Sequence, residues 1–186
     1  MELDKAIKTR HSSRRFKTKS PEWRDILKAI DAARLAPLAG NIQTIKFILV
    51  SDEDKIQQIA DACQQDFVGT VSYIVVFCTS PKQCERAYDK RALKYCLQQA
   101  GAAIENFLLK ITDLGLSACW VGAFNDEQIK KILKISEEVI VEAVFPVGYE
   151  MPKVSKQRLK PSLDECIFFD EWKNKYMKAI KKPEGL

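Results

Sequence analysis

The sequence lacks the features that would place the chain in a membrane, a disulfide-rich scaffold or a zinc site. No apolar run approaches the roughly 20 residues that a membrane-spanning helix needs. The six cysteines are scattered without a CxxC pair, and the single histidine has no clustered metal ligands around it. We therefore expect no membrane anchor, no disulfide framework and no metal. Residues 1–4 are polar and acidic, unlike a signal peptide, so a cytoplasmic location is expected.

The two glycine-rich motifs that usually cradle nucleotides, GxGxxG and GxxxxGK[ST], are also absent. The net charge of +5 is modest, and acidic residues are interleaved with the basic ones. This balance permits an anionic ligand but does not call for nucleic acid. With 186 residues, of which 46% are hydrophobic, the chain can bury the core of one globular domain.

Helical and strand-like patterns are interleaved along the chain, which predicts an α/β or α+β fold around a central sheet. Helices are predicted over residues 2–9, 21–36, 52–63, 90–113 and 126–133, and strands over residues 45–51, 71–79, 116–121 and 139–149. The buried stripe of the second helix is expected to consist of Trp23, Ile26, Leu27 and Ile30. The helix over residues 90–113 has little polar face, which is typical of burial, including burial between subunits.

One short segment, Arg10-His11-Ser12-Ser13-Arg14-Arg15-Phe16, concentrates groups that bind anions. In extended backbone alternate side chains point the same way, so Arg10, Ser12 and Arg14 would converge. Guanidinium groups match phosphate oxygens in both shape and charge. Taken alone, the same segment is equally compatible with a solvated basic stretch.

Four separate segments lie in an order that gives this cluster a meaning. They are residues 10–14, residues 36–43 (APLAGNIQ), residues 115–124 (GLSACWVGAF), and residues 146–149 (PVGY) followed by Lys156-Gln157-Arg158. The set resembles the nitroreductase family of FMN-dependent oxidoreductases over about residues 2–168. The resemblance implies an α+β fold with a central mixed or antiparallel sheet flanked by helices, assembled as an intertwined homodimer with FMN at the subunit interface.

The resemblance also implies a single FMN-binding domain over residues 1–186, with a tail from about residue 165 that packs on the partner subunit. Such a tail would account for the late aromatic residues Phe168, Phe169 and Trp172. The alternative is that these aromatics close the core of their own subunit. In the family, the long helix that corresponds to residues 90–113 forms much of the dimer interface.

By resemblance, the FMN phosphate is bound by basic and hydroxyl side chains, which here are Arg10, His11, Ser12, Arg14, Lys156 and Arg158. The chemistry agrees, because several charge-assisted hydrogen bonds can offset the desolvation of a phosphate. For Lys156 and Arg158 the alternative is a solvated basic tail.

The flavin ring is assigned by resemblance to Pro37, Leu38, Asn41, Gln43, Gln64, Gly122 and Ala123. Asn41 and Gln43 match the family's Asn-x-Gln, which commonly reaches the flavin from the other subunit, although Asn41 could also simply cap a turn. The stretch through Gly122 passes the reactive N5 atom of the flavin and offers it a backbone N–H. On physical grounds alone, Gly122 could instead end a strand.

The implied reaction is ping-pong. NADH or NADPH reduces FMN by hydride transfer to N5, and an electron-poor small molecule such as a nitroaromatic or a quinone is then reduced. No side-chain acid or base is required, so no catalytic residue is predicted, and neither nucleic acid nor membrane is an expected partner. Two departures from the family lie beside the expected substrate pocket: Leu38 in place of serine, and Thr44-Ile45 in place of Pro-Trp.

Two other functions stay open at this point. One is a specialised flavin enzyme on the same scaffold, either a flavin-fragmenting synthase or a reductive dehalogenase. The other is a basic protein without flavin that binds nucleic acid or another anion through residues 10–15 and the lysine-rich tail. The sequence decides neither the electron acceptor nor the choice between NADH and NADPH.

Overall fold

The computed structural model describes residues 1–152 and 160–178, and the chain divides into two compact units, Met1–Pro152 and Lys153–Leu186. In the second unit a short helix, α7 (Leu163–Cys166), is followed by a turn. The rings of Phe168 and Trp172 meet edge to face there, with centroids 4.7 Å apart, and Lys175 Nζ lies 4.2 Å from the Phe168 centroid. That the tail begins near residue 165 and packs on a partner stays a prediction.

A four-stranded antiparallel sheet forms the centre of the first unit. Its strands are, in spatial order, β1 (Ile45–Val50), β2 (Tyr73–Thr79), β4 (Ile140–Gly148) and β3 (Ser117–Ala118). The central position of β2 explains its continuous apolar run, since both of its faces are covered. The predicted α+β class with a central antiparallel sheet is confirmed.

The strand predicted over residues 116–121 is shorter than expected. Only Ser117 and Ala118 pair with β4 as a ladder, and Val121 makes a single bridge to Val144 further along. The backbone between them leaves the sheet and carries Trp120, whose side chain is 44% exposed. The irregular backbone matters because it forms part of the candidate site described below.

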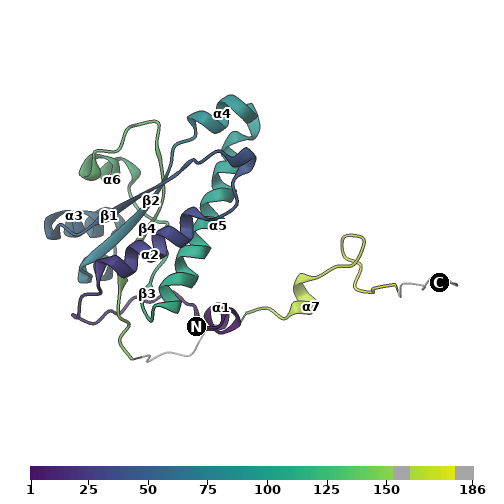
Figure 1. Ribbon diagram of the computed structural model, residues 1–186, viewed down its shortest axis with the longest axis horizontal. Coiled ribbons are helices and arrows are strands. Elements are labelled where there is room, and N and C mark those ends of the chain that lie inside the picture. Colours follow the sequence, from purple (N-terminus) through teal and green to yellow (C-terminus); the bar gives the residue numbers. More distant parts are fainter. Residues whose placement is uncertain (153–159, 179–186) are drawn as a thin grey trace. The chain divides into compact units, whose positions relative to one another are not determined.

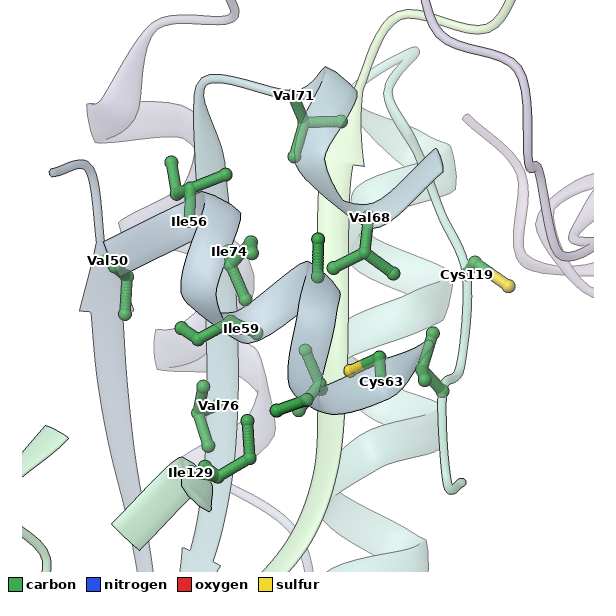
Figure 2. Packing of buried hydrophobic residues seen from close by; sticks show 14 of the residues in the cluster. Val50, Ile56, Ile59, Cys63, Val68, Val71, Ile74, Val76, Cys119 and Ile129 are labelled. Atoms are coloured by element: carbon green, nitrogen blue, oxygen red, sulfur yellow. The ribbon is translucent and has the colours of Figure 1, made fainter. Parts of the chain in front are cut away.

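Helices cover both faces of the sheet (Figure 1). On one face lie α2 (Trp23–Arg34) and α5 (Ala92–Asp113), and on the other lie α3 (Glu53–Cys63) and α6 (Asp126–Leu133). The core under α5 includes Phe77, Phe107 and Phe145, whose ring centroids are 5.0–5.4 Å apart. Figure 2 shows the core on the other face, where Ile59 and Cys63 of α3 lie over the sheet.

Shorter helices complete the first unit: α1 (Leu3–Thr9), η1 (Ala39–Asn41), η2 (Asp66–Thr70), α4 (Lys82–Tyr88) and η3 (Asp89–Arg91). Sequence patterns did not predict η2, α4 or η3. The starts of α3 and α6 follow sequence rules well, because Asp52 and Asn125 accept hydrogen bonds from backbone N–H groups three residues later, each at 3.0 Å.

The buried stripe predicted for α2 is partly wrong. Ile26 is buried as expected, but Trp23 and Leu27 are 39% and 41% exposed, and the other buried positions are Ala29 and Ala33. Small alanine side chains let α2 approach α5 closely, so the large side chains lie beside that contact rather than within it.

Large apolar side chains are exposed on three helices of the first unit: Leu3, Ile7, Trp23, Leu27, Leu93 and Leu97. The helix predicted to be buried, including burial between subunits, is α5, and its first turns are open in one chain. No helix in the described parts of the chain is long and apolar enough to cross a membrane.

Candidate functional site

The Arg10–Phe16 segment is extended and runs beside β3. The backbone N–H of Ser13 donates to the carbonyl of Ala118 at 3.0 Å. Ser13 is buried, whereas Ser12 and Arg14 on either side of it are exposed. The alternation predicted from extended backbone is therefore present, and it presents the Ser12 hydroxyl and the Arg14 guanidinium to solvent.

The two arginines of the segment have different neighbours within one chain. Arg10 Nε lies 3.5 Å from Glu105 Oε1 of α5. The Arg14 guanidinium carbon lies 5.8 Å from the ring centroid of Phe67 in η2, and Arg14 has no ion pair in the described residues. An incoming anion therefore meets one unpaired guanidinium and one that it must share with a carboxylate.

His11 is held by two acceptors. Its Nδ1 lies 2.8 Å from the Thr9 carbonyl oxygen, and its Nε2 lies 2.8 and 2.9 Å from the two carboxylate oxygens of Glu150. One ring nitrogen therefore faces a backbone carbonyl and the other a carboxylate. The imidazole thus ties the segment to Glu150, and its predicted contact with a phosphate stays a prediction.

Two predicted site residues that lie far apart in the sequence, Gln64 and Ala123, line the same cleft. The cleft has a volume of about 320 Å³ and is lined by Ala62, Cys63, Gln64, Ala123, Phe124 and Asn125. The Asn125 N–H donates to the Ala62 carbonyl at 2.9 Å, which holds the loop against the end of α3. Burial raises the pKa of the Cys63 thiol to about 11, so this wall of the cleft stays uncharged.

Gly122 leaves the backbone beside this cleft open. A Cβ at this position would meet only Trp120 Nε1, at 4.0 Å. The Trp120 ring packs against Phe145 of the core, with ring centroids 5.9 Å apart. This contact holds the Trp120 side chain beside Gly122. The main chain at Gly122 is therefore exposed, with the Trp120 side chain as its nearest neighbour on the Cβ side.

The loop over residues 37–43 lies at the other end of the sheet. It enters β1 opposite Thr79 of β2, whereas residues 12–14 run beside the end of the sheet that holds Tyr73. A strand rises about 3.3 Å per residue, so the two ends of β2 are about 20 Å apart. One chain therefore does not bring these two groups of predicted site residues together.

Within that loop, Gly40 and Asn41 both have a φ of 56°. A Cβ on Gly40 would overlap the hydroxyl at the end of the Tyr88 side chain of α4, and the positive φ itself favours glycine here. Gln43 Nε2 donates to the Ile45 carbonyl at 3.2 Å, which leaves its amide oxygen for another partner. Asn41 itself is exposed.

The remaining predicted residues are placed less informatively. Pro37 is exposed and Leu38 is half-buried at the start of the same loop, and Lys156 and Arg158 lie outside the described residues.

Sequence reasoning missed the neighbours of the predicted site, namely Phe67, Tyr88, Glu105 and Glu150, because no motif marks them. Residues 1–152 and 160–178 contain no group of three or more side chains that could hold a metal ion.

Comparison with known proteins places this arrangement in a family. The profile of the nitroreductase family matches residues 7–71 and 62–149. An Archaeoglobus fulgidus protein, provisionally named an NADH dehydrogenase/NAD(P)H nitroreductase, is 33% identical over 157 residues, which cover 82% of this chain and 86% of that protein.

Solved structures agree with the sequence comparison. The crystal structure of a nitroreductase family protein from Clostridium novyi NT has a TM-score of 0.74 and 31% identity, covering 94% of this chain and 96% of that one. The NADPH:FMN oxidoreductase from Vibrio harveyi, complexed with NAD+, has a TM-score of 0.80 over 96% of this chain and 79% of its own, and at 16% identity it shows the fold alone. The chain belongs to the nitroreductase family.

Proposed function

We propose that this chain passes electrons from NADH or NADPH through FMN to an electron-poor small molecule such as a nitroaromatic or a quinone. Its membership of the nitroreductase family makes it a flavin-dependent NAD(P)H oxidoreductase. The alternative of a basic binding protein without enzymatic activity is therefore set aside. The class of electron acceptor and the residues that hold FMN belong to the proposal.

The open backbone at Gly122, beside the cleft that Gln64 and Ala123 line, is the observation that carries the proposal. By resemblance to the family, a backbone N–H of this stretch would approach the flavin ring. The Arg14 guanidinium reaches the same neighbourhood, because it faces the ring of Phe67, three residues after Gln64. An open backbone for the ring and an unpaired guanidinium for the phosphate fit FMN.

FMN, when bound, supplies the electron transfer between the nicotinamide and the acceptor. The chain's own residues bind and orient it. Arg14, Arg10 and the Ser12 hydroxyl would donate hydrogen bonds to the phosphate, with Glu105 holding the Arg10 side chain in place. The main chain at Gly122 and Ala123 would donate to the polar edge of the ring.

We further propose that a second copy of the chain completes the site. Residues 37–43 lie too far from residues 12–14 within one chain to reach the same FMN, so Asn41 and Gln43 would come from the partner subunit. The exposed side chains of Trp23, Leu93 and Leu97 offer an apolar surface that such a partner would cover.

Titration with FMN tests the proposal. The unmodified protein should take up FMN and acquire its yellow absorbance. Replacing Arg10 and Arg14 together by Ala should weaken binding by about 3 kcal/mol, or roughly a hundredfold, because two charge-assisted donors are lost. The matched control replaces Lys131 and Lys134 of the α6 end by Ala, which removes the same charge elsewhere. A protein that takes up no FMN would contradict the function, and unchanged affinity in the arginine variant would contradict the site.

A further inference from the structure

Residues 82–94, here called the basic segment, carry a group of charges that the proposed FMN site does not use. Its cationic side chains are Lys82, Arg86, Lys90, Arg91 and Lys94, and its acidic ones are Glu85 and Asp89. All five cationic residues are exposed, and none of them forms an ion pair in the described parts of the chain. The segment therefore carries an excess of positive charge on exposed side chains.

The missing ion pairs do not reflect a lack of carboxylates. Lys82 and Glu85 lie three residues apart on α4, the spacing at which Lys28 pairs with Asp25 at 2.8 Å on α2. Exposed cations that leave a nearby carboxylate unused are available to a ligand. A run of such cations attracts anions and raises their local concentration.

The basic segment is fixed to the rest of the molecule by a small core of its own. This core consists of Cys84, Ala92 and Cys96. Next to it, the rings of Tyr88 and Tyr95 meet edge to face with centroids 5.0 Å apart. Arg91 donates to the Tyr95 hydroxyl at 3.5 Å, which restrains one of the cations. The packing of this small core thus holds the backbone of the segment in place.

The segment changes direction at a strained residue. Asp89, which caps the end of α4 and begins η3, has a φ of 43° and a ψ of −121°, which is costly for any residue other than glycine. Backbone strain of this kind is found at ligand-binding turns and persists only where the surrounding structure holds it. Here it joins two short helices, so cations from α4 and from η3 lie on either side of one turn.

The basic segment lies beside the loop over residues 37–43, where α4 sits near the first turns of α5 (Figure 1). The Tyr88 hydroxyl fills the space that a side chain on Gly40 would need. Just after the loop, the Thr44 hydroxyl donates to Gln99 Oε1 of α5 at 3.2 Å. Under the proposed function this loop borders the flavin ring, so a reductant whose nicotinamide covers the ring can extend its adenosine half toward the basic segment.

We infer that the basic segment binds the 2′-phosphate of NADPH and so makes NADPH the preferred reductant over NADH. This inference rests on the proposed function, which places the nicotinamide at the flavin. A phosphate monoester presents charge and three acceptor oxygens where NADH has only a ribose hydroxyl, and arginine and lysine side chains bind such a group directly. Arg86 and Lys90 lie on either side of the Asp89 turn and are the side chains assigned to this contact.

Binding of nucleotide fragments tests the inference without relying on turnover. Calorimetric titration of the purified protein with adenosine 2′,5′-bisphosphate and with 5′-AMP compares ligands that differ by one phosphate. The bisphosphate should bind about tenfold more tightly. The combined change Arg86→Gln and Lys90→Gln should remove this preference, whereas the control Lys131→Gln and Lys134→Gln, which removes equal charge from α6, should keep it.

Equal binding of the two fragments to the unmodified chain would overturn the inference, and so would an equal loss of preference in the α6 control. Because the fragments need no flavin, a protein that fails to take up FMN contradicts the proposed function, while the fragment titration still decides the role of the basic segment.

Steady-state kinetics gives a second, independent readout. With one acceptor, the ratio of kcat/KM for NADPH to that for NADH should exceed about ten, and the Arg86→Gln, Lys90→Gln variant should bring it close to one. The preference should also weaken with added salt, because exposed charges are screened. The variant could instead change the preference between 4-nitrobenzoate and 4-nitrobenzamide as acceptors and leave the ratio of NADPH to NADH efficiency unchanged. In that case the segment binds the acceptor, and the inference is wrong.

Discussion

The imidazole of His11 meets the carboxylate of Glu150 at 2.8 Å, although 139 positions separate the two residues in the sequence. This contact fastens the segment that carries the predicted phosphate ligands to the chain that follows β4. The backbone supports the same junction, since the Met151 N–H donates to the Arg15 carbonyl at 3.0 Å. The geometry of the proposed phosphate site therefore depends on Glu150, a residue that no sequence motif marks.

Replacing Glu150 by Ala should lower both stability and FMN affinity. The pair is partly exposed, so its loss should cost about 1 kcal/mol in the free energy of unfolding. Urea denaturation measures that cost, and FMN titration measures the loosening of Arg14 and Ser12. A variant with reduced stability and unchanged FMN affinity would show that the contact serves the fold alone.

Gly122→Leu should separate binding from folding. A Cβ at this position meets only Trp120 Nε1 at 4.0 Å, so the fold should tolerate the side chain with a stability change within about 0.5 kcal/mol. FMN affinity should nevertheless fall at least about tenfold, because the side chain would occupy the approach of the ring. Gly101→Ala on α5, where a Cβ meets nothing within 4 Å, is the control that should bind FMN normally. Equal FMN binding by both variants would contradict the placement of the ring.

The parts of the fold that sequence predicted well are those in which a local pattern and the tertiary environment agree. In α3 the capping residue Asp52 and the apolar positions Ile56 and Ile59 all favour the same helix, and the structure buries those positions. The apolar run of β2 likewise predicts a strand covered on both faces. Where apolar pattern and burial disagree, as at Trp23 of α2, the side chain stays exposed in one chain, where a second copy could cover it.

The candidate site could be predicted only as separate residues. Motifs locate Arg10 and Arg14, but their partners Glu105 and Phe67 come from distant helices and carry no signature of their own. The segment that holds α4 and η3 was missed for a related reason: its few buried residues show no apolar period along the sequence. The Tyr88 hydroxyl of this segment lies beside Gly40.

That contact predicts an energetic coupling between two residues. Gly40→Ala should destabilise the protein by about 1–2 kcal/mol, because the new Cβ overlaps the Tyr88 hydroxyl and the backbone has a φ of 56°. In a Tyr88→Phe background the same change should cost less, since the overlapping atom is gone while the unfavourable φ remains. Urea denaturation of the four proteins in this double-mutant cycle measures the coupling. Additive effects would mean that the loop and α4 are not in contact.

Thiol labelling should distinguish one cysteine from the other five. Cys166 is exposed, whereas the remaining five are buried. Burial also raises the pKa of Cys63, Cys78 and Cys96 to about 11 in each case, so little reactive thiolate is present near neutral pH. A thiol reagent should therefore modify one group per chain quickly in native protein and the rest only after unfolding. Rapid labelling that persists in Cys166→Ser would contradict the burial of the other thiols.

Glu142 of β4 predicts how stability depends on pH. Burial raises the pKa of its carboxyl above the ordinary 4.5 of the unfolded chain, so the folded protein binds the proton more tightly than the unfolded one. The contribution of the protonated carboxyl to the free energy of unfolding is therefore fully present below about pH 4.5. This contribution is lost as pH rises through the higher pKa of the folded state.

Glu142→Gln keeps the shape of the side chain and removes this titration. The variant should be more stable than the unmodified chain at pH 7, by less than about 1 kcal/mol because water partly screens the group. The difference should vanish or reverse near pH 4, where the carboxyl of the unmodified chain is protonated. Thermal unfolding of both proteins between pH 4 and pH 7 measures the difference in stability. If the variant is the less stable of the two proteins at pH 7 but not at pH 4, the fold stabilises the carboxylate and the prediction is wrong.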